Sequence, residues 1–163
     1  MSYKEKISKE QTKQSKYSPG LIELDEIVAR VLFSPKHYHN GEILPTAFSP
    51  AIFKGLSVLR KKYNFCECLS RTIEILEKDG KNEYCGYAYA NVKDIKNIIE
   101  NNYRIFYLLD SATKDRIGHA DIYPIKIKEI RLPRKALNNY IRLKISEVFK
   151  IYILKIESAK QTM

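Results

Sequence analysis

The spacing of the hydrophobic positions predicts that the folded part of the chain begins with a helix. Between Ser18-Pro19 and Ser34-Pro35 the apolar residues recur every three or four positions, which is the period of a helix with one buried face. Serine is a good N-cap, and the residue before a proline is driven out of the helical region, so these two pairs mark the expected ends. The buried face would consist of Leu24, Ile27, Val28, Val31 and Leu32.

The rest of the chain changes several times between strand-like and helix-like patterns. Asn40-Gly41 supplies two positive-φ residues for a tight hairpin turn, but the flanks are short, so a loop is the alternative. Strands are expected over residues 53–60, 84–90, 104–109 and 118–125. Helices are expected over residues 66–78 and 92–101, and from Pro133 onward. Residues 151–156 are rich in β-branched side chains, so a change from helix to strand there is left open.

These elements predict one α+β domain, with a small mixed sheet of about four or five strands, helices packed on it and a long C-terminal helix. Residues 1–17 contain almost nothing apolar and are expected to form a flexible basic tail. The globular domain would span residues 18–157, and residues 158–163 would form a flexible C-terminus. A chain of 163 residues with 44% hydrophobic content buries a sizeable core without metal or disulfide, so no cofactor is expected.

Composition also bears on the compartment. No apolar run is long enough for a membrane-spanning helix, and the Lys-rich start lacks the apolar centre of a signal peptide. Three cysteines are too few, and odd in number, for a disulfide framework. Cys66 and Cys68 would diverge on a helix, and no second cysteine pair completes a zinc site with Cys85, so buried reduced thiols are favoured over metal. We therefore expect a cytoplasmic protein with no membrane partner.

The net charge of +10 is concentrated at the two ends of the chain. Residues 1–20 carry +3, residues 21–124 carry 0, and residues 125–163 carry +7. Seven cations fall close together where the final helix begins, opposed there by Glu129, and could follow a phosphate backbone. An acidic protein partner or a solvated surface would explain the same charges. The candidate nucleic-acid-binding residues are Lys126, Lys128, Arg131, Arg134, Lys135, Arg142 and Lys144.

Three histidines are the candidates for proton transfer. His37 and His39 lie in one short segment, and His119 lies two residues before Asp121. Two histidines can serve as base and acid in phosphodiester cleavage, while turn or surface hydrogen bonds are the simpler alternative. In the strand expected between these segments, Ser57 is a possible hydroxyl nucleophile, and the cation Arg60 or Lys54 could stabilise the charge of a phosphate. The surrounding glycines form neither a nucleophile elbow nor a phosphate-binding loop.

Three functional hypotheses follow from these features. The first is a non-enzymatic accessory or adaptor domain that binds nucleic acid or a nucleoprotein complex through the C-terminal basic segment. The second is a small enzyme with nuclease or ADP-ribose chemistry, in which His39, His119 and Arg60 are catalytic. The third is a protein-interaction subunit that uses its C-terminal helix. The enzyme requires at least two histidines beside one concave pocket, whereas the adaptor requires only a continuous basic face. Tyrosines such as Tyr87 and Tyr89 could stack bases or simply cover the core.

Overall fold

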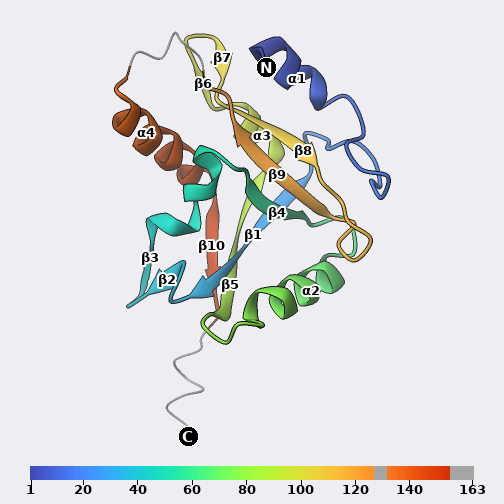
Figure 1. Ribbon diagram of the computed structural model, residues 1–163, viewed down its shortest axis with the longest axis vertical. Helices are drawn as coiled ribbons and strands as arrows, with labels where there is room; N and C mark the ends of the chain where they lie inside the picture. Colours follow the sequence, from blue (N-terminus) through green and yellow to red (C-terminus); the bar gives the residue numbers. More distant parts are fainter. Residues whose placement is uncertain (127–131, 155–163) are drawn as a thin grey trace, which may run out of the picture.

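A computed structural model describes residues 1–126 and 132–154, and its centre is a six-stranded antiparallel sheet (Figure 1). The expectation of an α+β domain with a C-terminal helix is confirmed, although the sheet has more strands than expected and its neighbouring pairs are all antiparallel. In spatial order the strands are β10 (Lys150–Ile153), β5 (Glu83–Asn91), β1 (Ile27–Ser34), β4 (Leu56–Arg60), β9 (His119–Pro124) and β8 (Phe106–Asp110).

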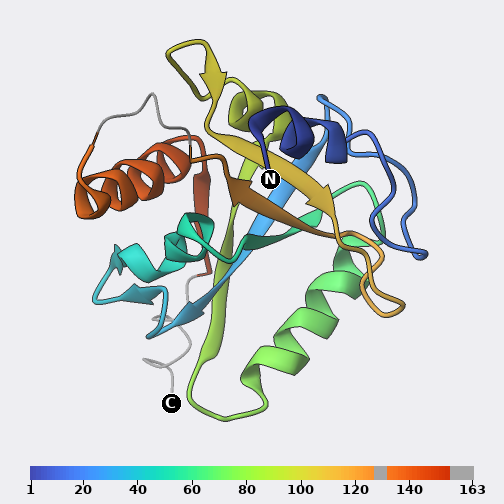
Figure 2. The same ribbon diagram turned by 45° about the horizontal axis from the view of Figure 1, so that its top comes forward.

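Helices cover both faces of this sheet (Figures 1 and 2). One face carries the larger core cluster, which includes Val28 and Leu32 and is covered by α3 (Val92–Lys96), α4 (Arg134–Glu147) and the 3₁₀ turns η1 (Pro45–Ala47) and η2 (Ser49–Ile52). The other face carries a smaller cluster of Val31, Phe33, Leu59 and Cys68, which is covered by α2 (Phe65–Glu77). The strands β1 and β4 are therefore buried on both sides.

The prediction of a helix over residues 18–34 is wrong, because residues 27–34 form the central strand β1. Consecutive residues of β1 point to opposite faces, and each face meets a different core cluster. A strand buried on both faces loses the polar alternation that normally identifies it. Its continuous apolar run then also satisfies a helical period, so the period alone could not decide between the two.

Several local predictions are confirmed. Asn40 and Gly41 both have positive φ, 51° and 79°, and turn the hairpin of β2 (Tyr38–His39) and β3 (Glu42–Ile43). Helix α2, strands β4, β5, β8 and β9, and the change from helix α4 to strand β10 all lie close to the expected ranges. Gly86 faces the backbone of β10, and a Cβ there would meet Tyr152 O at 2.1 Å. The chain thus uses glycine where another strand approaches closely.

The expected helix over residues 92–101 is shorter in the structure. It ends as α3 at Lys96, and the chain continues into a small hairpin of β6 (Ile99–Glu100) and β7 (Tyr103–Arg104). The turn uses Asn101 and Asn102, whose φ values are 51° and 65°. Asparagine tolerates this left-handed conformation better than other side chains that carry a Cβ, which explains why the turn of the hairpin falls at these two residues.

The first 17 residues, for which a flexible tail is expected, contain a short helix. Residues 3–9 form α1 (Tyr3–Lys9), which begins with a capping box between Ser2 and Glu5 and lies against β8 (Figure 2). Glu10, which directly follows this helix, is buried. Its carboxylate forms an ion pair with Lys96 Nζ at 2.9 Å and accepts a hydrogen bond from a guanidinium nitrogen of Arg104 at 3.0 Å. Two cations from the folded domain therefore hold this segment, although it has no apolar stripe.

The C-terminal helix α4 packs its apolar stripe within this chain. Ile141 and Ile145 are buried in the larger core cluster, with Leu137 and Val148 packed against it. The stripe that could have faced a partner chain is thus largely covered by the sheet and by η2. Within residues 1–126 and 132–154, no helix combines the length and the apolar character needed to cross a membrane.

Candidate functional site

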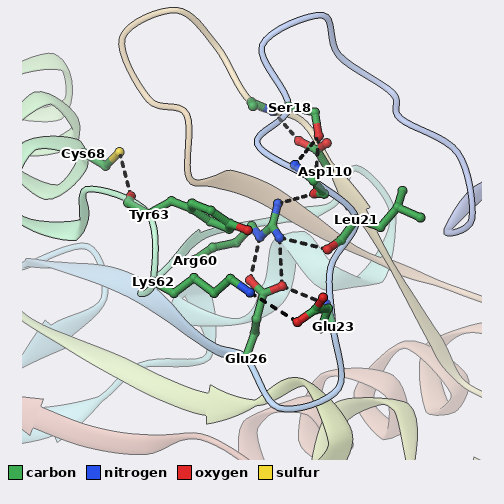
Figure 3. Close-up of polar contacts among 11 residues, drawn as sticks. Ser18, Leu21, Glu23, Glu26, Arg60, Lys62, Tyr63, Cys68 and Asp110 are labelled. Carbon is green, nitrogen blue, oxygen red and sulfur yellow. Dashed lines mark hydrogen bonds and ion pairs between the residues drawn. The ribbon is translucent and has the colours of Figure 1, made fainter.

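Arg60, one of the candidate phosphate-binding residues, lies in a closed ionic cluster (Figure 3). Its side chain is fully buried at the end of β4 and forms two parallel hydrogen bonds with Glu26, Nε to Oε1 at 2.7 Å and Nη2 to Oε2 at 2.8 Å. The guanidinium also donates to the carbonyl oxygens of Gly20 and Leu21. Arg60 is thus surrounded by protein acceptors.

Glu26 is equally well satisfied. Its Oε2 accepts a hydrogen bond from Glu23 N at 2.7 Å in addition to the Arg60 contacts. Burial acts to raise the pKa of Glu26, but the hydrogen bonds and charge of Arg60 outweigh it, so the pKa lies below its ordinary value. The pair therefore stays ionised at neutral pH. We regard this cluster as structural, because it ties the loop before β1 to the end of β4.

A cavity of about 450 Å³ lies beside these two strands. The β1–β4 ladder has only the pairs Val28–Arg60 and Ala29–Leu59. Past these two pairs the strands separate, and the cavity lies between the second half of β1, the beginning of β4 and the helix α2. Helix α2 contributes Thr72, Ile75 and Leu76 to the wall of the cavity. Its volume is typical of a small-molecule site. The charged, histidine and hydroxyl side chains that line it are Arg30, Lys36, His37, Lys54, Ser57, Thr72, Arg116, His119 and Asp121.

Arg30 differs from Arg60 in its partners. Its Nε donates to Ala47 O at 2.9 Å and its Nη1 to Ser57 O at 3.3 Å, so backbone carbonyls hold the guanidinium in place. Within the described residues no carboxylate forms an ion pair with Arg30. Burial lowers the pKa of Arg30 to about 10, against the opposing attraction of Asp121. Arg30 remains charged at neutral pH, but that charge is poorly compensated.

His37 faces Arg30 and is a hydrogen-bond donor toward the cavity. Its Nδ1 accepts the Phe33 N–H at 3.1 Å, so in the neutral ring the proton is on Nε2. Burial, together with the charges of Arg30 and Lys36, lowers the pKa of His37 to about 3, so the ring is neutral at pH 7. His37 Nε2 lies 3.5 Å from Arg30 Nη2. Two donors therefore lie side by side, which is an arrangement that suits an anionic oxygen.

His119 has the opposite tautomer. Ser57 and Asp121 are directly paired residues of β4 and β9, as are Leu59 and His119, so these four side chains share the face of the sheet that α2 covers. Ser111 Oγ donates to Asp121 Oδ2 at 2.7 Å, and the same Oγ lies 2.7 Å from His119 Nδ1. The only hydroxyl proton of Ser111 is then in use, so His119 Nδ1 carries the proton that it donates to Ser111.

The Nε2 atom of His119 is consequently an unprotonated acceptor. Burial lowers the pKa of His119 below its ordinary value, although the charge of Asp121 acts in the opposite direction. The ring is thus neutral at pH 7. Asp121 orients it indirectly: it accepts from Ser111, and its second oxygen accepts from Ser57 Oγ at 3.1 Å. An oriented imidazole with a free basic nitrogen is the arrangement that general-base catalysis needs.

The charge balance of the cavity is positive. Among its lining residues, four cations (Arg30, Lys36, Lys54 and Arg116) oppose one carboxylate, Asp121, which two serine hydroxyls already solvate. Low-dielectric walls strengthen the resulting field. The cavity therefore favours a ligand that carries negative charge.

The candidate residues from the sequence divide between this cavity and other places. His119, Lys54, Ser57 and Asp121 line it, whereas His39 lies exposed in the β2–β3 hairpin and Arg60 lies in the buried cluster. The sequence reasoning did not select His37 as catalytic, since nothing in a His-Tyr-His segment indicates which histidine turns inward.

Arg30 was also missed, because it lies in a segment that was assigned to a helix. The signal for it was present, however. A single arginine interrupts the apolar run Ile27–Phe33, and a charge in a strand buried on both faces needs a partner or a ligand.

The C-terminal basic residues are spread along the surface at the start of α4. Arg134 and Lys135 are exposed, and Lys144 lies over the ring of Tyr140. Lys126 Nζ lies 5.4 Å from the centre of the Phe53 ring. Burial and the nearby charges of Arg134 and Lys6 lower the pKa of Lys126. Arg142 is half-buried on α4. Lys128 and Arg131 lie outside the described residues.

None of the three cysteines lines this cavity. Cys66 is exposed on α2, while Cys68 and Cys85 belong to core clusters on opposite faces of the sheet. Burial raises the pKa of Cys85 to about 11. Across residues 1–126 and 132–154, no group of three or more histidine, cysteine or acidic side chains is arranged to hold a metal ion.

Comparison of the chain with family models, with curated proteins and with solved structures found no match in any of the three. The class of protein is therefore given by its α+β architecture, and any function has to be argued from the chemistry of the cavity.

Proposed function

We propose that this protein is a small enzyme that acts on a phosphate ester, with the cavity between β1, β4 and α2 as its active site. The observation that carries the proposal is the pair of neutral histidines with complementary tautomers in one positively charged cavity. His37 Nε2–H lies beside Arg30 as a donor, and His119 presents an unprotonated Nε2. The nuclease and nucleotide chemistries considered from the sequence both belong to this class, with His37 in place of His39 and Arg30 in place of Arg60.

Each group then has a defined role in hydrolysis. Arg30 and His37 bind phosphoryl oxygens and stabilise the charge that builds on them in the transition state. His119 takes one proton from water as the water oxygen forms the new bond to phosphorus. The bond to the ester oxygen breaks, and that oxygen leaves with the bonding electron pair and receives a proton from His119 or solvent. Asp121 and Ser111 keep the His119 ring in the required orientation.

The test compares two histidines in one assay. Wild type, His119→Ala and the control His39→Ala would be measured on bis(4-nitrophenyl) phosphate, cyclic nucleotides, ADP-ribose and short oligonucleotides. We expect His119→Ala to lower kcat/KM by about 10²- to 10⁴-fold, the usual contribution of a general base. His39→Ala should leave it unchanged because His39 is exposed and does not line the cavity. Absence of turnover by the wild type on the whole panel would refute the proposal, as would equal effects of the two substitutions.

A second candidate function is the nucleic-acid-binding accessory or adaptor domain. It is favoured by the gathering of Lys6, Lys126 and Arg134, whose mutual repulsion is relieved by a polyanion. An acidic protein surface would do the same. Charge reversal of Lys126, Arg134 and Lys135 to Glu should then remove binding of a fluorescent single-stranded oligonucleotide at low salt. Unchanged binding, or none by the wild type, would exclude nucleic acid as the partner of this segment.

A further inference from the structure

A second hollow of about 260 Å³ adjoins the cavity. Phe53 lines this hollow, while the next residues along the chain, Lys54 and Gly55, line the cavity itself. Strand β9 also runs past both spaces, since Asp121 lines the cavity and Tyr123 lines the hollow. Residues two apart on a strand point to the same face and lie about 7 Å apart. The two spaces are therefore neighbours along one face of the sheet.

Aromatic rings line the hollow. The rings of Tyr107 and Tyr123 are stacked, with centres 5.4 Å apart. Tyr123 also lies against Gly55, where a Cβ would come within 2.8 Å of the ring. The absence of a side chain at Gly55 thus lets the tyrosine lie between the hollow and the cavity. Phe53 completes the wall and is 62% exposed, which is high for a large apolar side chain, and Lys126 Nζ lies over its ring.

Positive charge lies on the far side of these rings. Lys6 and Lys126 line the hollow, and Arg134 is close enough to disturb Lys126 electrostatically. Going along β9, a ligand would meet the cations of the cavity, then the aromatic faces, then a second group of cations. Alternating phosphates and bases of a single nucleic-acid strand match this order, because aromatic rings stack on any base while cations follow the backbone.

We infer that the hollow binds the base of a nucleotide whose phosphate occupies the cavity, and that the next phosphate of the strand lies against Lys6 and Lys126. The inference rests on the proposed function for the phosphate in the cavity. It adds the substrate class: a single-stranded oligonucleotide, with one base stacked on Phe53 in the hollow that Tyr123 also lines. Sequence preference is weak in such a site, since every base offers a π face.

The test uses three probes that add one feature at a time: ribose 5-phosphate, adenosine 5′-monophosphate (AMP) and the 5′-phosphorylated dinucleotide pApA. Binding to wild type and to variants would be measured by calorimetry at one salt concentration. A stacked base contributes about 1–3 kcal/mol, so AMP should bind roughly 5- to 140-fold more tightly than ribose 5-phosphate. Phe53→Ala should remove that gain and leave ribose 5-phosphate unaffected. Lys126→Met should weaken pApA more than AMP.

Two further variants serve as controls. Phe53→Trp keeps an aromatic face and should retain AMP binding, and Tyr152→Ala removes an exposed ring from the distant edge strand β10 and should change nothing. Equal affinities for AMP and ribose 5-phosphate, or AMP binding that survives Phe53→Ala, would overturn the base site. Equal affinities for AMP and pApA would overturn the strand. Failure of ribose 5-phosphate to bind, or binding that is insensitive to Arg30→Met, would instead overturn the proposed function.

Discussion

Arg30 and Arg60 lie on the adjacent central strands β1 and β4, but Arg60 is fully buried whereas Arg30 is half-buried, and their surroundings differ. Arg60 has a carboxylate at 2.7 Å and two carbonyl acceptors, so its charge is fully compensated. Arg30 has carbonyl partners, a neutral histidine and an open cavity. A buried charge that the protein compensates stabilises the fold, whereas one that it leaves uncompensated is available to a ligand.

The comparison also separates the two kinds of acceptor network. Glu26 accepts hydrogen bonds only from its own structural neighbours, in a cluster that closes a loop. Asp121 accepts hydrogen bonds from the hydroxyls of Ser57 and Ser111, and Ser111 in turn contacts His119 Nδ1 and orients the ring. The first network ends in the protein interior and the second ends at a free ring nitrogen.

The largest effect is expected from Arg60→Met. It leaves the Glu26 carboxylate buried without a partner, and breaking such a pair typically costs about 3–5 kcal/mol. The free energy of unfolding would be measured by urea denaturation at pH 7. The double variant Arg60→Met with Glu26→Gln should recover part of the loss, because the unpaired charge is then gone. A single-variant loss below about 1 kcal/mol would show that the cluster is not structural.

The Glu10 cluster offers a third example of a compensated buried charge. Glu10→Gln removes the carboxylate that Lys96 and Arg104 share, and hydrogen bonds to charged groups contribute about 1.5–3 kcal/mol each. We expect a loss of that order in the free energy of unfolding, and a similar loss when residues 1–17 are removed. Glu5→Gln, at an exposed position of the same helix, is the control. An unchanged melting curve for the truncated chain would restore the flexible tail expected from composition.

A smaller effect is expected from pH, and it originates in the cavity. The pKa of His37 is about 3 in the folded protein and about 6.5 when unfolded, so the unfolded state binds more protons between these values. The contribution of His37 to stability is therefore complete above pH 6.5 and is lost as pH falls toward 3. Between pH 7 and pH 5 the loss amounts to about 2 kcal/mol.

The variant His37→Asn isolates this contribution. Its side-chain oxygen can accept the Phe33 N–H in place of Nδ1, but it does not titrate in this range. The difference in the free energy of unfolding between pH 7 and pH 5 should therefore be about 2 kcal/mol smaller in the variant than in wild type. Parallel pH profiles of the two proteins would mean that His37 is not held neutral by its surroundings.

The smallest change in stability is expected from Arg30→Met, the same substitution that is severe at Arg60. No carboxylate among the described residues loses an ion pair, and removing an uncompensated charge offsets the loss of two carbonyl contacts, so the change should stay within about 1 kcal/mol. Ligand binding should respond instead. Added inorganic phosphate should raise the Tm of wild type and leave that of the variant unchanged. A large destabilisation by Arg30→Met would place Arg30 with the structural residues.

Much of the local structure was determined by the sequence itself. The Asn40-Gly41 hairpin, the end of α2 before Gly80 and the alternating strands β5 and β9 follow from positive-φ residues and from periods that neighbours a few positions apart decide. His119, Ser57 and Asp121 could likewise be selected as candidates, because their residue types carry recognisable chemistry. Such features depend on short stretches of chain, so they can be predicted without knowledge of the fold.

Other features were decided only by the tertiary structure. The segment 27–34 is a strand because β4 and β5 pair with it and two cores bury its faces, and no local pattern states this. The same placement gives Arg30 an open cavity and Arg60 a carboxylate, although both are arginines on central strands of the sheet. His37 rather than His39 turns inward for a similar reason. Whether a buried charge stabilises the fold or binds a ligand depends on the partners that distant segments of the chain place beside it. Long-range packing decides which partners these are.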